Sequence, residues 1–161
     1  MDPGPHELEK RYRRFLEGKG DAVGPLLCYL GGGGDARAVS GAWAAAIVSR
    51  IFLLKGNIPL ARAYLRIAAA RSSATGRMDL RGRTASATLR LGILVNRAII
   101  LKVSGNAGAA AALLRAIVDR ALREGETFVA SKAASNLALC MARSGDAAGA
   151  VSYLGLAERG Y

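Results

Sequence analysis

The fold of this chain is decided by residues 145–157, which read Gly145-Asp146-Ala147-Ala148-Gly149-Ala150-Val151-Ser152-Tyr153-Leu154-Gly155-Leu156-Ala157. The stretch opens with a Gly-Asp dipeptide, then places an alanine five residues after the glycine, a leucine nine after it and an apolar residue twelve after it. The same pattern follows two more dipeptides: Gly56-Asn57 with Ala61, Leu65 and Ala68, and Gly105-Asn106 with Ala110, Leu114 and Ile117. Including Gly20-Asp21, the dipeptides recur at intervals of 36, 49 and 40 residues. Such periodic self-similarity predicts a stack of helical hairpins.

The composition also favours helices. Of the 161 residues, 52% are hydrophobic but only 6% are aromatic, so alanine and leucine must supply most of the packing. Small side chains suit helices that approach each other closely, whereas strands favour β-branched and aromatic residues. No apolar run reaches the roughly 18 residues of a membrane span, because each candidate is interrupted by a basic residue: Arg50, Lys55, Arg90, Arg97 or Lys102. Residues 1–6 have no apolar core, so we expect no secretory signal and a cytoplasmic protein with no membrane partner.

We therefore expect residues 1–161 to form a single all-α domain of about eight helices. Residues 1–34 form an irregular first hairpin and a glycine-rich connector, and residues 35–161 form three regular hairpins. The expected helices cover residues 6–18, 23–30, 36–55, 58–72, 84–104, 107–124, 127–144 and 147–160. In the first of them, one face carries Leu8, Tyr12, Phe15 and Leu16. At the turns, glycine accepts the left-handed conformation at a helix end, and Asn57 or Asp146 can cap the next helix.

The repeated positions resemble those of the tetratricopeptide (TPR) family. Small residues stand seven positions before each of the three later glycines, and large apolar residues four before: Ser49, Ala98, Ala138 and Phe52, Leu101, Met141. The resemblance covers roughly residues 38–160 and implies a short right-handed solenoid of antiparallel hairpins. The repeats are longer than the family's usual 34 residues, and the family's tryptophan and closing proline are missing from their positions. A generic helical bundle is the alternative fold.

In TPR proteins, the first helices of the hairpins line a groove that holds an extended peptide or a partner helix. The resemblance implies that partner-binding residues lie at the matching positions here, namely Arg50, Asn96, Lys132 and Asn136, with help from Arg90 and Arg97. Amide and ammonium donors that converge on one groove suit a carboxylate. A structural hydrogen-bonding role is the alternative for each asparagine.

The charge is strongly basic and unevenly distributed. The chain has 23 basic and 12 acidic residues, a net charge of +11, and residues 50–97 contain ten basic residues against the single acid Asp79. Arginine favours forked recognition of carboxylate or phosphate, and a field of one sign is evidence about partners. Residues 71–83 are predicted to form a basic contact loop that carries Arg71, Arg77, Arg81 and Arg83; a solvated linker is the alternative.

The sequence offers little for catalysis. Cys28 and Cys140 lie 112 residues apart in apolar stretches and are expected to be buried thiols rather than a disulfide. With one histidine, His6, there is no zinc-ligand spacing, and no paired carboxylates suggest acid–base chemistry. We expect no enzyme, no metal site and no cofactor.

These observations favour an interaction scaffold whose basic groove binds an acidic peptide or protein segment. The alternative is an RNA- or ribosome-associated protein that binds phosphate backbone through the same surface, with Lys10, Arg11, Arg13 and Arg14 adding charge and Tyr12 stacking on a base. The last expected helix carries Val151, Leu154, Leu156 and Ala157 and shows no polar outer face, so we also expect it to meet a second copy of the chain, as a homodimer, or another partner.

Overall fold

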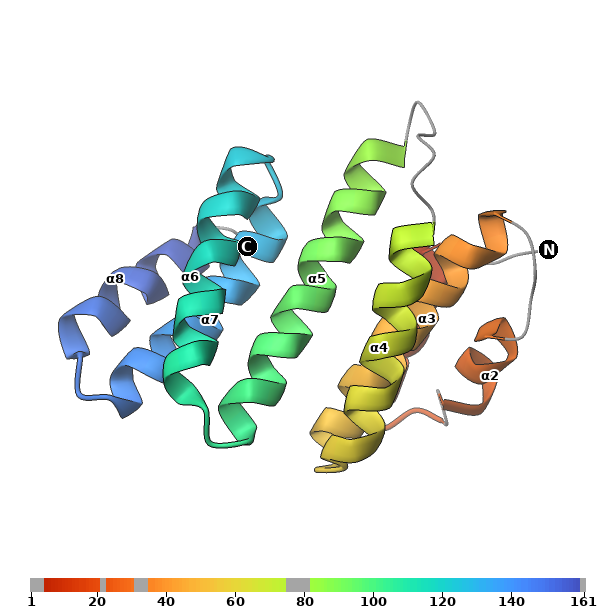
Figure 1. Cartoon of the computed structure of the whole chain (residues 1–161), viewed down its shortest axis with the longest axis horizontal. Coiled ribbons are helices and arrows are strands. Elements are labelled where there is room, and N and C mark those ends of the chain that lie inside the picture. Colours follow the sequence, from red (N-terminus) through yellow and green to blue (C-terminus); the bar gives the residue numbers. More distant parts are fainter. Residues whose placement is uncertain (1–4, 21–22, 31–34, 75–81, 160–161) are drawn as a thin grey trace. The chain divides into compact units, whose positions relative to one another are not determined.

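The computed structural model describes residues 5–20, 23–30, 35–74 and 82–159, and these residues form helices and short turns only (Figure 1). The prediction of an all-α chain is confirmed. Among the described residues there are eight α-helices and one short 3-10 helix: α1 (Pro5–Leu16), α2 (Val23–Leu27), η1 (Cys28–Leu30), α3 (Asp35–Leu54), α4 (Ile58–Ala74), α5 (Gly82–Val103), α6 (Ala107–Arg123), α7 (Thr127–Arg143) and α8 (Ala147–Glu158).

The chain divides into two compact units, Met1–Asp79 and Leu80–Tyr161. In the first unit, α3 packs against α4, and α1, α2 and η1 pack against α3. In the second unit, α5 packs against α6, α6 against α7, and α7 against α8, so consecutive helices are neighbours (Figure 1). The three expected hairpins, α3–α4, α5–α6 and α7–α8, are therefore formed, and α6 and α7 make a fourth contact of the same kind.

One type of turn joins these helices. Gly56, Gly105, Gly125 and Gly145 all have φ between 72° and 85°, a left-handed conformation that costs an L side chain energy. At each turn, the N–H of the residue after the glycine bonds the carbonyl five residues before it, as from Asn57 to Phe52 at 2.8 Å. This is the Schellman ending of a helix. Gly125 was not part of the sequence repeat, yet its turn is the same, so Gly105, Gly125 and Gly145 follow one another at 20-residue intervals.

The predicted caps form at two of the three repeated dipeptides. The Oδ1 atom of Asn57 accepts from the N–H of Leu60 at 3.2 Å, and that of Asp146 accepts from the N–H of Gly149 at 2.9 Å. Asn106 makes no such side-chain bond. In the first unit, Gly20 has a positive φ of 96°, as a turn at this glycine requires. α1 itself is followed by an earlier turn at Gly18, whose φ is 72° and where the N–H of Lys19 bonds the carbonyl of Arg14.

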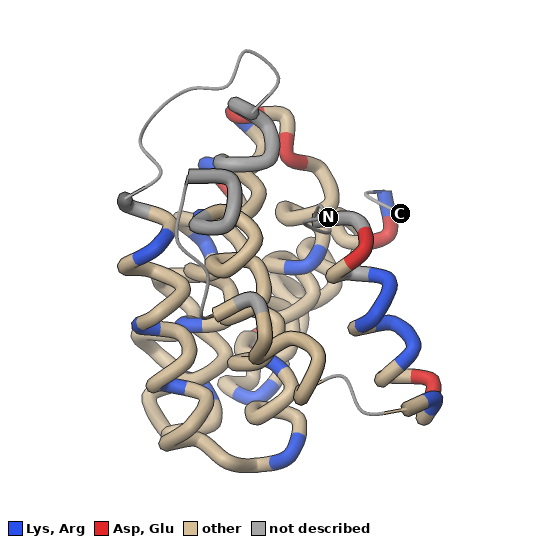
Figure 2. Tube along the Cα trace, turned by 90° about the vertical axis from the view of Figure 1, so that its right-hand side faces the viewer, with Lys and Arg blue, Asp and Glu red and all other residues tan. Residues whose placement is uncertain are grey.

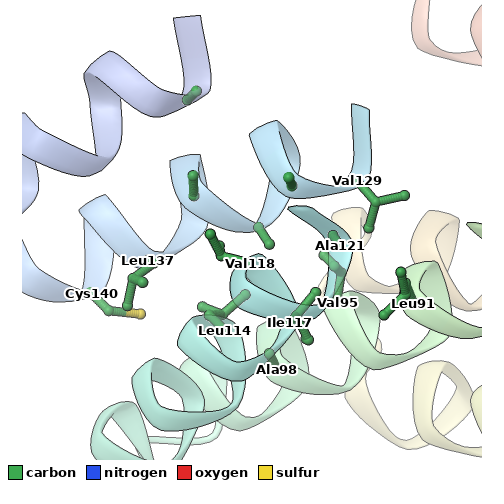
Figure 3. Packing of buried hydrophobic residues seen from close by; sticks show 14 of the residues in the cluster. Leu91, Val95, Ala98, Leu114, Ile117, Val118, Ala121, Val129, Leu137 and Cys140 are labelled. Carbon is green, nitrogen blue, oxygen red and sulfur yellow. The ribbon is translucent and has the colours of Figure 1, made fainter. Parts of the chain in front are cut away.

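The core of the second unit is built from aliphatic and small side chains of four helices. Figure 3 shows how the labelled residues of α5, α6 and α7 face one another, with Leu114 of α6 between Leu137 of α7 and Ala98 of α5, and Ile117 of α6 beside Val95 of α5. Ala110 at the turn end of α6 is fully buried, as close approach of helix α5 requires. In α7, the hydroxyl of Ser131 donates to the carbonyl of Ala157 in α8 at 2.7 Å, which ties the last hairpin together.

The core of the first unit relies more on aromatic rings. Leu8, Tyr12 and Leu26 are buried against α3, and Phe52 stacks on Tyr64 with ring centroids 5.5 Å apart. The expectation that Leu16 shares the buried face of α1 was wrong. Its side chain, at the last residue of α1, is 55% exposed.

The basic loop is shorter than the sequence predicted. α4 continues to Ala74 and α5 begins at Gly82, because no glycine or proline ends α4 before Gly76. Arg71 therefore belongs to α4 and Arg83 to α5, while Arg77 and Arg81 lie outside the described residues. Arg71 is half-buried, and its Nη2 donates to the carbonyl of Leu30. It satisfies a carbonyl at the end of η1.

Candidate binding surface on α7

One face of α7 carries both basic and apolar side chains that reach the surface. Phe128, Lys132, Asn136, Leu139 and Arg143 recur at intervals of three or four residues, which places them on one side of a helix. We call this set the α7 stripe. Phe128 is 48% exposed and Leu139 is 54% exposed, and the Nζ of Lys132 lies 5.4 Å from the centroid of the Phe128 ring.

A hydrogen bond from α5 reaches the middle of the stripe. The Nζ of Lys102 donates to Oδ1 of Asn136 at 2.9 Å. The Nδ2 of Asn136 donates to the carbonyl of Lys132 at 3.0 Å, so the amide is held with its oxygen toward Lys102. Asn136 therefore positions the ammonium of Lys102. It accepts the hydrogen bond of Lys102 with a neutral amide oxygen and not with a carboxylate.

The ammonium of Lys102 is in an unfavourable environment. Burial lowers the pKa of Lys102 below its usual value, the nearby thiol of Cys140 opposes this, and the charge of Arg143 lowers the pKa further. Neither Lys102 nor Arg143 forms an ion pair with a carboxylate of the described residues. Two cations therefore lie close together on this surface without a described counter-ion.

A second polar contact links α5 to the start of α7. The hydroxyl of Thr88 donates to Oε2 of Glu126 at 2.6 Å. Glu126 is buried at the N-terminus of α7, and its side chain does not cap that helix. Its carboxylate therefore takes part in the contact between α5 and α7.

Of the residues that the sequence nominated, only Lys132 and Asn136 lie in the stripe. Asn96 is buried in α5, which fits a structural role better than partner contact. Arg90 and Arg97 are exposed on α5, but they lie about 120° and about 140° around the helix from Lys102. The two arginines therefore point in a different direction from the α5 residue that contacts Asn136. Arg50 belongs to the first unit, where its guanidinium lies 5.2 Å from the centroid of the Tyr12 ring.

Sequence reasoning missed Lys102, Phe128, Leu139 and Arg143 as site residues. The spacing of Phe128, Lys132, Asn136 and Leu139 on a single helix was available in the sequence and would have found the stripe. The contribution of Lys102 was not available, because it depends on how α5 packs against α7.

Other site types find no support in the described part of the chain. No group of three or more His, Cys, Asp or Glu side chains among those residues could hold a metal ion. Cys28 and Cys140 are both free thiols; Cys140 is buried as expected, but Cys28, the first residue of η1, is exposed. None of the described helices combines the length and the apolar character that crossing a membrane requires.

Comparisons add no relative to this picture. No family model, no curated protein and no solved structure matches the chain. The TPR-like character therefore stays a prediction from the sequence repeat.

Proposed function

We propose that the chain is a non-enzymatic scaffold that binds an acidic segment of a partner protein along the α7 stripe. The observation that carries this proposal is the half-buried ammonium of Lys102, bonded to the neutral amide of Asn136 and close to Arg143. A desolvated cation without a counter-ion gains most from an incoming carboxylate, because charge-assisted hydrogen bonds are stronger than neutral ones.

The exposed apolar residues define the rest of the partner. Phe128 and Leu139 lie on either side of Asn136 along the helix, and exposed apolar side chains beside polar ones are typical of protein interaction sites. A partner that places carboxylates against Lys102 and Arg143 and an aliphatic side chain against Leu139 would satisfy both features. An acidic amphipathic segment has this chemistry, whereas a bare phosphate backbone leaves Leu139 exposed.

A labelled acidic peptide of glutamate and leucine at helical spacing tests the proposal by fluorescence anisotropy. We expect Lys102→Gln to weaken binding about tenfold, equivalent to about 1.4 kcal/mol, because it removes the charge that Asn136 positions. Arg115→Gln is the matched control, since Arg115 is an exposed arginine on α6 in the same unit, and it should change affinity less than twofold. Equal weakening by the two variants would assign the binding to overall charge and not to the stripe.

A second copy of the chain is the partner that we propose for α8. Val151 is 70% exposed and Leu154 is 47% exposed, and residues 147–157 contain no charged side chain. Two chains of net charge +11 repel each other least where such an uncharged, apolar helix is the surface of contact. Light scattering across a concentration series should show a dimer that Val151→Glu dissociates; a strict monomer at high concentration would end this proposal.

A further inference from the structure

The first unit has a basic hollow that takes no part in the function proposed above. Its volume is about 310 Å³, and α1 and the residues that follow it form its walls: Glu7, Lys10, Arg11, Arg14, Lys19, Gly20 and Pro25. We call it the α1 cleft. Four cations and one carboxylate line it. We propose that the α1 cleft binds phosphate groups of a single-stranded nucleic-acid backbone.

The cations of the cleft have spare hydrogen-bonding capacity. Among the described residues, neither Lys10 nor Arg14 has a carboxylate partner. The Nε of Arg11 is buried and has no hydrogen-bond acceptor there, although Glu7 approaches it to 3.5 Å. A buried donor without an acceptor is costly, and a phosphate oxygen is the acceptor that a guanidinium fork suits best.

The geometry of α1 holds these cations in one place. The Schellman ending at Gly18 turns the chain back, with the N–H of Lys19 bonded to the carbonyl of Arg14 at 2.8 Å. The ammonium of Lys19, which follows the end of α1, thereby joins the cations carried by the helix. On the opposite face, Leu8 and Tyr12 are buried in the core of the unit. The helix is therefore anchored by its apolar face, with its basic face presented outward.

The extent of the positive surface favours a polyanion over a small anion. Arg13 is exposed on α1 next to the cleft but does not line it, and basic positions follow one another along this helix in Figure 2. Charge that continues beyond the cleft can contact further phosphates of a chain. An anionic membrane fits less well, because the apolar face of α1 that would enter it is buried.

The chemistry also separates this cleft from the α7 stripe. No exposed aromatic or aliphatic side chain larger than Pro25 lines it, so an acidic amphipathic peptide would find no apolar contact. Tyr12 cannot stack on a base, as the sequence had suggested, because it is buried under the guanidinium of Arg50. Binding should therefore depend on the backbone alone, without sequence preference and with steep salt dependence.

The test is the affinity of the full chain for a labelled single-stranded RNA of mixed sequence, measured by anisotropy between 50 and about 200 mM salt. The test variant is Lys10→Gln with Arg14→Gln. The control is Arg62→Gln with Arg66→Gln, a pair that has the same spacing on α4, is exposed in the same unit and removes the same charge. Circular dichroism checks that both proteins keep their helicity.

We expect the Lys10/Arg14 variant to weaken binding at least tenfold at low salt. The slope of log affinity against log salt concentration should be smaller in magnitude by about 1.4 for this variant. Each phosphate contact on a single strand contributes about 0.7 to the slope, and the variant loses two contacts. The control should keep the slope of the unaltered chain. Failure of the unaltered chain to bind RNA at 50 mM salt, or an equal loss in the control, would overturn the proposal. So would competition by the acidic peptide or by anionic lipid vesicles as effective as that by unlabelled RNA.

Discussion

The two units of this protein reach helical packing in different ways. The second unit joins α5, α6, α7 and α8 by three turns of one geometry at 20-residue intervals, and its core is aliphatic. The first unit has a single regular hairpin, and α1, α2 and η1 pack on it around the rings of Tyr12 and Phe52. Helices joined by identical turns can pack closely enough for small side chains to fill the core between them. In the first unit the helices differ in length, and large rings fill the space between them.

The charges differ in the same way. In the first unit, the cations of α1 lie around an open hollow. In the second unit, Lys102 is drawn partly into the contact between α5 and α7. An open cluster suits a flexible polyanion, and a half-buried cation beside apolar side chains suits a shaped protein segment. Net charge alone therefore does not define a partner, because burial and neighbours decide what a cation can bind.

The largest effect should come from the core of the second unit. Leu114→Ala removes a fully buried side chain whose cluster consists of residues of that unit, and we expect a loss of about 2–5 kcal/mol in the free energy of unfolding. Urea unfolding followed by circular dichroism measures it. The single tryptophan, Trp43, lies in α3 of the first unit, so its fluorescence transition should stay in place. An equal shift of the circular-dichroism and fluorescence transitions would contradict the presence of two separate cores.

A smaller effect tests the turns. Gly125→Ala forces an L side chain to adopt φ of 75°, and we expect a loss of about 1–2 kcal/mol. Gly155→Ala is the matched control, since Gly155 lies within α8 and its added methyl group would meet open space. The control should be neutral or stabilising by up to about 1 kcal/mol. If the two variants had equal free energies of unfolding, the left-handed glycine of the recurring turn would not be what stabilises this unit.

The smallest effect concerns the pH dependence of stability. Because burial lowers the pKa of Lys102 in the folded chain below the usual 10.5, the unfolded chain binds more protons between those two pKa values. The free energy of unfolding should therefore rise with pH in that window, and the cost of the buried charge is fully present at pH values below it.

Lys102→Met should remove this cost. We expect the variant to be more stable than the unaltered chain at neutral pH, and the advantage to shrink as pH rises toward 10.5. Urea unfolding at neutral and alkaline pH measures the difference, with Arg115→Met as the control. An advantage independent of pH would mean that packing, and not the charge of Lys102, is responsible.

Much of the fold could be predicted because its determinants are local. Gly56, Gly105 and Gly145 mark helix ends through their own conformation, and Asn57 and Asp146 cap through side chains that act within three residues. The turn at Gly125 was expected between helices 107–124 and 127–144, but not as a copy of the repeat, because glutamate follows the glycine. Glu126 can stand there since its carboxylate bonds Thr88 of α5, a contact that the sequence does not reveal.

The candidate site was harder to predict because its determinants are contacts between helices. Asn136 was nominated from its own position in the repeat, but the residue that it positions, Lys102, comes from a different helix 34 residues earlier. Arg71 was assigned to a partner, although it bonds the carbonyl of Leu30. An arginine in a basic segment can satisfy the protein itself, and only the packing distinguishes the two roles.

The most direct test of the α7 stripe is an NMR titration of the labelled full chain with the acidic amphipathic peptide. Binding along the stripe should give saturable shifts of the side-chain amide of Asn136 and of the backbone amides of Phe128, Lys132 and Leu139, with little change along α1. Shifts confined to α1, or spread evenly over every exposed arginine, would contradict it.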